Sequence, residues 1–218
     1  FGTQALVVAK LATELGLPVF SYFRGTDASR ALGSRQRVRA YRRMMPRLDG
    51  IFAVSQFLLD NLARHGVSHP NAHVIPSGVD IRRFAPEAKI PGSCLAVGRM
   101  VEKKAPQITL RAFARAAADR PGHLTFVGDG PLLDSCRRLA AELGMAGRVT
   151  FTGALPHDAV RAHLATTEIF LQHSVTDRNG NTEGLPTAIQ EAVAAGCIPV
   201  STRHAGIPEA ITEGENGF

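Results

Sequence analysis

Two glutamates, Glu183 and Glu191, stand eight residues apart on either side of a predicted helix start. Pro186 suits the first turn of that helix because it needs no backbone N–H there, and Gly196 ends the apolar pattern that follows. We therefore expect the helix to begin near Leu185. Because a helix rises by about 1.5 Å per residue, the two carboxylates would lie roughly 12 Å apart along its axis.

Groups that bind anions at a helix N-terminus lie between the two carboxylates. The backbone N–H groups of Gly184, Leu185 and Thr187 have no partners within the first turn, and the helix dipole is positive there. A matching ligand carries hydroxyls at both ends and an anion between them, as a nucleoside diphosphate sugar does. The alternative is that both glutamates are ordinary helix-terminus and solvent-facing acids.

Arg99 and Lys104 follow a predicted strand that ends at Val97-Gly98. Loops at the carboxyl ends of parallel strands meet bound ligands, and a guanidinium and an ammonium fixed there can stabilise charge on a phosphate without a metal. The alternative is that these are surface charges, which is the interpretation we prefer for Lys103. No Asp-x-Asp pattern calls for a metal, and the eight histidines form no metal-binding set.

Residues 128–130 (GDG) resemble the start of a dinucleotide fingerprint, but Leu133 stands where its third glycine belongs and no acid follows near residue 150. We therefore expect no nicotinamide cofactor. Gly130 is instead predicted to form a tight turn that uses its backbone freedom.

Strand-like and helix-like segments alternate along the chain, which predicts parallel sheets covered by helices. Apolar runs mark strands near residues 18–23, 51–54 and 73–75, and then near 94–97, 123–127, 149–152, 168–172 and 198–201. The segment 84–92, which contains proline and charges, is a predicted linker. We predict an α/β fold with two Rossmann-like domains, residues 1–86 and 87–218, of which the first is incomplete.

The composition indicates a globular chain in a reducing compartment. It has 218 residues, 44% of them hydrophobic, and three cysteines without metal or redox spacing. Cys136 shares a helical face with Leu132, Leu139 and Leu143, which predicts a core position. No apolar run approaches the roughly 20 residues of a membrane span, and no leader pattern opens the chain. We expect a cytoplasmic protein and no nucleic-acid partner.

Positive charge gathers in the first part of the chain. Residues 1–86 hold 12 Lys and Arg against 5 Asp and Glu, whereas the whole chain has a net charge of +6. Much of it lies in residues 34–47, where Arg35, Arg39 and Arg42 share a helical face. An anionic membrane surface is one predicted partner of this segment, and a solvated arginine-rich helix is the alternative.

Five segments occur in an order typical of one enzyme family: residues 74–80 (VIPSGVD), 97–99 (VGR) with 102–104 (EKK), 127–131 (VGDGP), 183–191 (EGLPTAIQE) and 206–209 (GIPE). On these motifs, which span most of the chain, it resembles the retaining glycosyltransferases of family 4, with the two-domain GT-B fold. Residues 102–106 and 174–182 further resemble enzymes that build bacterial exopolysaccharide of the colanic acid kind.

The resemblance implies a role for each candidate residue. Glu183 would hold the transferred sugar, Glu191 the ribose, and Arg99 and Lys104 the diphosphate. Gly98, Gly130, Leu155, Gly184, Leu185 and Thr187 would line the donor site, with the nucleotide base against the loop that contains Leu155. A structural role is at least as plausible for Gly206 and Glu209, which lie at a turn and a helix start.

Two positions depart from the family pattern. Ala105 stands where the family usually has glycine, so the backbone there must accommodate a Cβ. Arg24 stands where the family usually has a histidine that bonds the transferred sugar; an arginine can donate hydrogen bonds but stays protonated and cannot act as a base. Asp27 either holds Arg24 or is a simple loop acid. The resemblance also implies that both ends of the fold lie outside this sequence.

The resemblance implies a retaining, metal-independent hexosyltransferase that uses a UDP-sugar or GDP-sugar, needs no cofactor, and acts on a saccharide or lipid-linked acceptor. It would work in the cytoplasm, at the cytoplasmic face of the inner membrane. A non-catalytic nucleotide-sugar-binding module is the alternative, motivated by Arg24 and the incomplete first domain. A GT-B phosphorylase or epimerase is a third interpretation that the fold alone does not exclude.

Overall fold

The computed structural model describes all 218 residues and divides into two compact units. Unit 1 contains Phe1–Ser77 together with Thr176–Pro186 and His204–Glu209. Unit 2 contains Gly78–Val175, Thr187–Arg203 and Ala210–Phe218. The chain first leaves unit 1 after Ser77, before the predicted boundary at residue 86, and two later segments return to unit 1. The predicted domain limits themselves stay a prediction.

Unit 1 is built on three parallel strands in the order β1-β2-β3. Strand β1 (Phe20–Phe23) pairs with β2 (Gly50–Ala53), which pairs with β3 (Ala72–Val74). The helices are α1 (Gly2–Glu14), α2 (Arg35–Met44) and α3 (Gln56–Arg64), with short 3-10 turns η1 (Thr26–Ala28), η2 (Arg30–Gly33), η3 (Met45–Arg47) and η6 (Ile207–Glu209). Its fully buried side chains include Phe23, Tyr41, Ile51, Leu58 and Leu62.

Helix α2 carries the arginines of the basic segment. Ser34 caps it by accepting a hydrogen bond from the Arg37 backbone N–H at 3.3 Å, and Tyr41 and Met44 are buried. The Tyr41 hydroxyl donates to the Asp27 carbonyl at 3.0 Å, and burial, reinforced by the negative charge of Asp27, raises the Tyr41 pKa to about 12. This buried contact anchors the inner face of α2 and leaves most of its arginines exposed.

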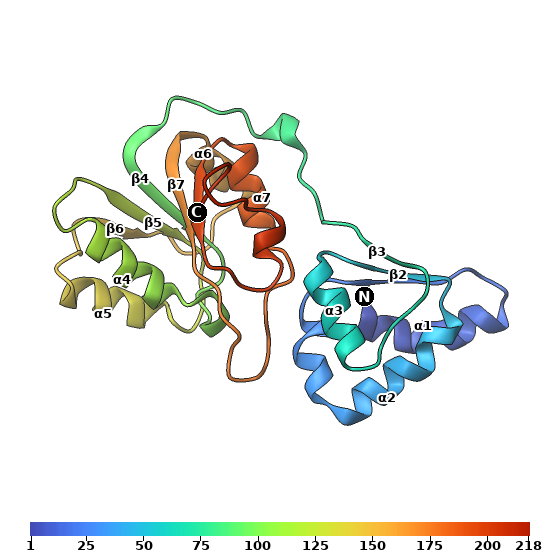
Figure 1. Cartoon of the computed structure of the whole chain (residues 1–218). Helices are drawn as coiled ribbons and strands as arrows, with labels where there is room; N and C mark the ends of the chain where they lie inside the picture. The colour runs from blue at the N-terminus through green and yellow to red at the C-terminus, as the bar shows by residue number, and fades with distance from the viewer. The chain divides into compact units, whose positions relative to one another are not determined.

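Unit 2 is built on five parallel strands in the order β6-β5-β4-β7-β8. They are β4 (Ile90–Val97), β5 (His123–Val127), β6 (Val149–Phe151), β7 (Thr167–Gln172) and β8 (Ile198–Ser201). The turns η4 (Ile81–Arg83) and η5 (Glu102–Lys104) flank β4. Helices α4 (Pro106–Ala116) and α5 (Leu133–Glu142) lie on one face of this sheet, and α6 (His157–Thr166) and α7 (Thr187–Ala194) lie on the other (Figure 1).

The apolar runs of the sequence coincide with these strands. One core cluster of unit 2 packs α4 and α5 on the sheet through Leu110, Phe113, Leu124 and Leu139, and it includes Cys136, which is fully buried as predicted. Burial raises the pKa of the Cys136 thiol to about 11, so the thiol is protonated and unreactive at neutral pH. None of the helices combines the length and apolar character needed to cross a bilayer.

Two predicted boundaries differ from the structure. Strand β4 begins at Ile90, inside the segment interpreted as a linker, because Ile90 pairs with Thr167 before a register shift that precedes Cys94. Helix α7 begins at Thr187 and not near Leu185. The helical rise therefore applies only from Thr187 onward, so helix geometry does not support the spacing of roughly 12 Å estimated for Glu183 and Glu191.

Lys89, just before β4, joins the ends of two helices in unit 2. Its Nζ donates hydrogen bonds to the carbonyl oxygens of Leu164 at 3.1 Å, Ala165 at 2.8 Å and Ala195 at 2.7 Å. These carbonyls lie in the last turn of α6 and just after α7, where helices leave carbonyl groups without internal partners. A cation there also complements the negative ends of the helix dipoles.

Lys89→Met should lower the free energy of unfolding by about 2 kcal/mol, because three carbonyl groups lose a charged donor while the aliphatic stem is kept. Urea denaturation followed by circular dichroism measures this change. Lys10→Met is the matched control, since Lys10 is 72% exposed and pairs only with Glu14 at 3.7 Å. Equal midpoints for the two variants would contradict the role given to Lys89.

Candidate donor site

The sheet of unit 2 has a topological switch point between β4 and β7. The chain adds β5 and β6 on one side of β4 and then crosses to add β7 and β8 on the other. In open parallel sheets, ligands bind at the carboxyl ends of the strands that flank such a point. Here those ends are Val97, followed by Gly98 and Arg99, and Gln172, followed by His173. Arg99, the first of the two predicted cations, therefore lies where the fold favours ligand binding.

A shallow, open hollow lies at this switch point. Arg99 and Lys104 both line it, and so does Gly98, which confirms that these three predicted residues lie together. The rest of the lining includes Pro106, Thr109, Gln172 and His173. Two cations and a strand end thus face one space, which suits a compact anion such as a diphosphate.

Glycines allow the loops after β4 and β5 to approach each other. A Cβ on Gly128 would lie 1.9 Å from the Gly98 carbonyl oxygen, and one on Gly130 would lie 2.6 Å from the Met100 carbonyl oxygen. Gly130 has φ +152°, so both space and backbone angle exclude a side chain. Backbone hydrogen bonds from Met100 N to the Asp129 oxygen, at 2.8 Å, and from Leu132 N to the Met100 oxygen, at 3.0 Å, fix the contact.

Ala105 links η5, which ends at Lys104, to helix α4. Its backbone has φ +38° and ψ +53°, the left-handed conformation that favours glycine, and it is the N-cap residue of α4. The chain reverses there between the turn that carries Lys104 and the helix that begins at Pro106. Alanine therefore takes the place of the family's glycine here at the cost of a strained backbone.

Gln172 and His173 are site residues that the sequence analysis missed. The Gln172 side chain is 5% exposed, and its Oε1 atom has no hydrogen-bond partner. Burial lowers the pKa of His173, so its imidazole is neutral at pH 7. The hollow therefore combines two cations with neutral polar groups. The signal available in the sequence was their position directly at the end of the apolar run 168–172.

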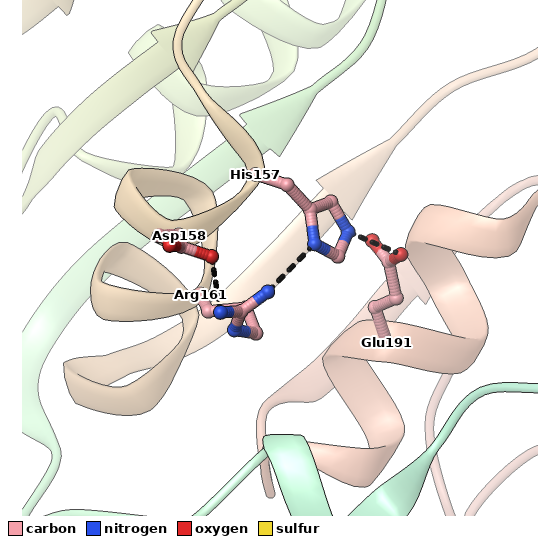
Figure 2. A network of polar contacts seen from close by, with 4 residues as sticks. All are labelled: His157, Asp158, Arg161 and Glu191. Atoms are coloured by element: carbon pink, nitrogen blue, oxygen red, sulfur yellow. Dashed lines mark hydrogen bonds and ion pairs between the residues drawn. The ribbon is translucent and has the colours of Figure 1, made fainter.

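A second group of polar residues in unit 2 surrounds Glu191 on α7 (Figure 2). The His157 Nε2 atom lies 3.0 Å from Glu191 Oε1, and Arg161 Nη1 lies 2.9 Å from His157 Nδ1. Arg161 also pairs with Asp158. The Glu191 side chain is only 13% exposed, which excludes the interpretation of this residue as a simple solvent-facing acid. No pattern along the chain pointed to His157, which is 34 residues from Glu191 in sequence.

Arg24, in unit 1, points its guanidinium at neighbours within that unit. Nη2 donates to Ser77 Oγ at 2.9 Å, and the group lies over the rings of Phe1 and Tyr22, 5.8 and 5.7 Å from their centroids. Asp27 holds the backbone rather than this guanidinium. Its carboxylate accepts from the N–H groups of Arg24, Gly25 and Gly2 at 3.0 to 3.1 Å.

The segment with Glu183 and Gly184 packs closely within unit 1. A Cβ on Gly184 would lie 2.5 Å from the Arg24 carbonyl oxygen and 2.6 Å from Val54 Cγ2. Glu183 and Leu185 are 7% and 8% exposed. Unit 1 therefore brings Glu183, Gly184 and Leu185 beside the backbone of Arg24, while Thr187 and Glu191 on α7 belong to unit 2, as does Leu155 in the loop before α6.

Gly206 and Glu209 have structural roles in unit 1. The Gly206 N–H donates to the Gly184 carbonyl oxygen at 3.0 Å. The Glu209 carboxylate accepts from the backbone N–H groups of Gln56 at 2.7 Å and Phe57 at 2.9 Å, so it caps the N-terminus of α3. These contacts fit the structural interpretation of this pair, and a role toward a ligand stays a prediction.

Comparison with known families decides the identity of the chain. The family described as "Glycosyl transferases group 1" matches residues 80–218, and the family described as "Glycosyltransferase Family 4" matches residues 1–83. The chain belongs to the group 1 glycosyl transferases. The resemblance to family 4 glycosyltransferases stated from the motifs is thereby confirmed.

Relatives of this group 1 chain include proteins named for polysaccharide biosynthesis. It is 30% identical over 226 residues to WcaL of Escherichia coli, provisionally assigned as a colanic acid biosynthesis glycosyltransferase, covering 100% of this chain and 55% of that protein. It is 27% identical over 202 residues to the amylovoran biosynthesis glycosyltransferase AmsK of Erwinia amylovora, covering 90% and 49%. The chain spans about half the length of these curated relatives.

Solved structures establish the fold of this group 1 glycosyl transferase. Anabaena Alr3699/HepE in complex with UDP superposes with a TM-score of 0.84 at 20% identity, over 100% of this chain and 62% of that one. Sucrose-phosphate synthase of Thermosynechococcus elongatus gives a TM-score of 0.79 at 20% identity, over 100% and 58%. The predicted GT-B fold, with two Rossmann-like parallel sheets, is confirmed.

Ala105→Gly should raise the free energy of unfolding by about 1 kcal/mol, because glycine adopts the left-handed conformation without the Cβ clash. Thermal unfolding of the purified chain measures the change. Ala112→Gly, at an exposed position inside α4, is the matched control and should lower stability by about 1 kcal/mol. Loss of stability in both variants would show that Ala105 is unstrained.

Proposed function

We propose that this chain carries the donor-binding machinery of a retaining glycosyltransferase that moves a hexose from a nucleoside diphosphate sugar to a saccharide or lipid-linked acceptor in polysaccharide biosynthesis. The observation that carries the proposal is the shared hollow of Arg99 and Lys104 at the switch point of the unit 2 sheet. Because the chain spans about half the length of its curated relatives, the activity of the whole protein is also a proposal.

The two cations would act on the leaving group. When the bond between the sugar and the diphosphate breaks, negative charge accumulates on the terminal phosphate. A guanidinium and an ammonium already oriented toward that phosphate stabilise this charge without reorganising at the moment of reaction. His173, neutral at pH 7, adds a polar surface without a third positive charge. We therefore expect activity to persist when a chelator removes divalent metal ions.

Two carboxylates would recognise the rest of the donor. Glu191, on α7 of unit 2, would accept hydrogen bonds from the ribose hydroxyls, and Glu183, in unit 1, is assigned to the transferred sugar by the family resemblance. Arg24 takes the place of a family histidine, and its guanidinium can donate to sugar hydroxyls but cannot accept a proton. The nucleotide base is assigned to the loop that contains Leu155.

Retention would follow from displacement on one face of the sugar. In this proposal no side chain forms a covalent bond to the sugar. The leaving diphosphate accepts the proton of the incoming hydroxyl as the glycosidic bond forms, within an ion-pair-like transition state. The protein supplies position and positive charge. The oxygen–carbon bond to the diphosphate breaks as the new one to the acceptor forms, so the reaction balances without a further reactant.

Related proteins support a UDP-sugar or GDP-sugar as the donor. Crystal structures of Anabaena Alr3699/HepE contain UDP, UDP with glucose, or UDP-glucose. A Mycolicibacterium smegmatis relative, 31% identical over 193 residues, is named as a GDP-mannose-dependent mannosyltransferase acting on a phosphatidylinositol monomannoside. These names motivate testing both nucleotides and a lipid-linked acceptor.

Arg99→Ala or Lys104→Ala should lower kcat/KM for the nucleotide sugar by about 100-fold, since a charge-stabilising donor at a leaving group contributes on that order. Release of nucleoside diphosphate from UDP-glucose and GDP-mannose, with EDTA present, is the measurement. Arg111→Ala, an exposed arginine of α4, is the matched control. Nucleotide binding by calorimetry without turnover would favour the non-catalytic binding module.

The basic surface of α2 is proposed to contact anionic lipid near the acceptor. Arg35, Arg37, Arg39 and Arg43 are exposed along it. Arg42, which was expected on the same face, donates from Nε and Nη2 to the His65 carbonyl oxygen at 3.1 and 2.7 Å and so ties α2 to the end of α3. Arginines near an anionic bilayer each contribute about 1 kcal/mol of attraction.

Arg39→Glu combined with Arg43→Glu should weaken binding to vesicles of phosphatidylglycerol by more than tenfold at low salt. Vesicle sedimentation at two ionic strengths measures this effect. Arg115→Glu combined with Arg138→Glu makes the same change of charge on exposed positions of unit 2 and serves as the control. Unchanged sedimentation of the α2 variant would refute membrane contact through this helix.

A further inference from the structure

The contacts on the two sides of the His157 ring indicate its tautomer. Arg161 Nη1 can only donate a hydrogen bond, so His157 Nδ1, 2.9 Å away, must accept and carries no proton. The ring proton therefore resides on Nε2, which donates to Glu191 Oε1 at 3.0 Å. The arginine selects the tautomer, and the tautomer supplies a donor to the carboxylate.

Each member of this chain of contacts is itself held in place. Asp158 pairs with Arg161, whose side chain is 19% exposed, so the guanidinium is anchored at the surface of α6. The ring of Phe84, a buried residue, meets the His157 ring edge to face with centroids 6.4 Å apart. Figure 2 shows His157 lying between Arg161 on its own helix and Glu191 on α7.

We infer that His157 is a positioning residue for nucleotide binding: it holds the Glu191 carboxylate through one oxygen, so that the other oxygen is oriented to receive the ribose hydroxyls. The inference rests on the proposed function, because it takes Glu191 as the ribose-binding residue. The Glu191 side chain has three rotatable bonds, and orienting it before the ligand arrives removes an entropic cost from binding. His157 acts through Glu191 and need not touch the ligand.

Two substitutions separate the contacts that His157 makes. Asn places an amide oxygen near the position of Nδ1 and can still accept from Arg161, but it is too short to reach Glu191. Gln reaches the position of Nε2 and can donate to Glu191 through its amide. His157→Asn should therefore lose the orientation of Glu191, and His157→Gln should restore most of it.

The test measures binding of UDP and GDP by calorimetry, and the tighter nucleotide is then used with its 2′,3′-dideoxy form. His157→Asn should weaken binding of the ribose form by about tenfold, equivalent to ~1.4 kcal/mol, while His157→Gln stays within about threefold of the unsubstituted chain. The dideoxy form should bind both variants and the unsubstituted chain equally. With the matching nucleotide sugar, His157→Asn should raise KM and leave kcat unchanged.

The controls distinguish failure of this inference from failure of the proposed function. His163→Asn changes a second histidine of α6 outside the network and should bind as the unsubstituted chain does. If Glu191→Ala weakens binding of the ribose form but His157→Asn does not, the positioning role is overturned and the ribose assignment stands. If Glu191→Ala has no effect although nucleotide binds, the ribose assignment itself fails. If His157→Asn weakens binding of the ribose and dideoxy forms equally, His157 supports the fold and does not act through the ribose contact.

Discussion

Unit 2 depends on the close approach of two loops at the carboxyl ends of β4 and β5. Hydrogen bonds between the backbones of residues 98–100 and 127–132 hold the loops together, and the space left for a Cβ at Gly128 or Gly130 is smaller than any side chain needs. This contact sets the path of the chain from β4 into η5. It therefore determines where Arg99 and Lys104 can place their charges.

The two recognition groups of unit 2 differ in how their charge is managed. At the hollow, positive charge is concentrated while His173 remains neutral, which favours an incoming anion. Around Glu191, charge alternates from Asp158 to Arg161, through the imidazole, to the carboxylate. The first arrangement suits a ligand whose charge changes during reaction, and the second suits a ligand that is only held.

Much of the fold follows from local pattern. Parallel strands read as apolar runs, so every strand was located from sequence, and the turn after β5 was identified by Gly130. The helix start at Thr187 was misplaced because Pro186 fits equally well just before a helix and in its first turn. Ala105 was recognised as unusual, but its left-handed backbone is a property of the folded turn.

The site was predicted best where its residues follow one another along the chain. Gly98, Arg99 and Lys104 were expected together and line one hollow. The contacts of Glu191 with His157, and of Glu209 with α3, join residues far apart in sequence through tertiary packing, which a single sequence does not encode in any local period. Lys89 is similar, since its importance lies in carbonyl groups that have no side-chain signature.

The order in which the chain visits its two units has a consequence for how this architecture can vary. The backbone changes units after Ser77, Val175, Pro186, Arg203 and Glu209, so unit 1 is completed by two excursions from the later part of the sequence. No single cut in the gene separates the two units, because a cut after Ser77 keeps unit 2 whole but removes Thr176–Pro186 and His204–Glu209 from unit 1. A chimera that exchanges one unit between relatives must therefore exchange those two excursions as well, and a chimera joined only after Ser77 would combine segments of unit 1 from two different proteins.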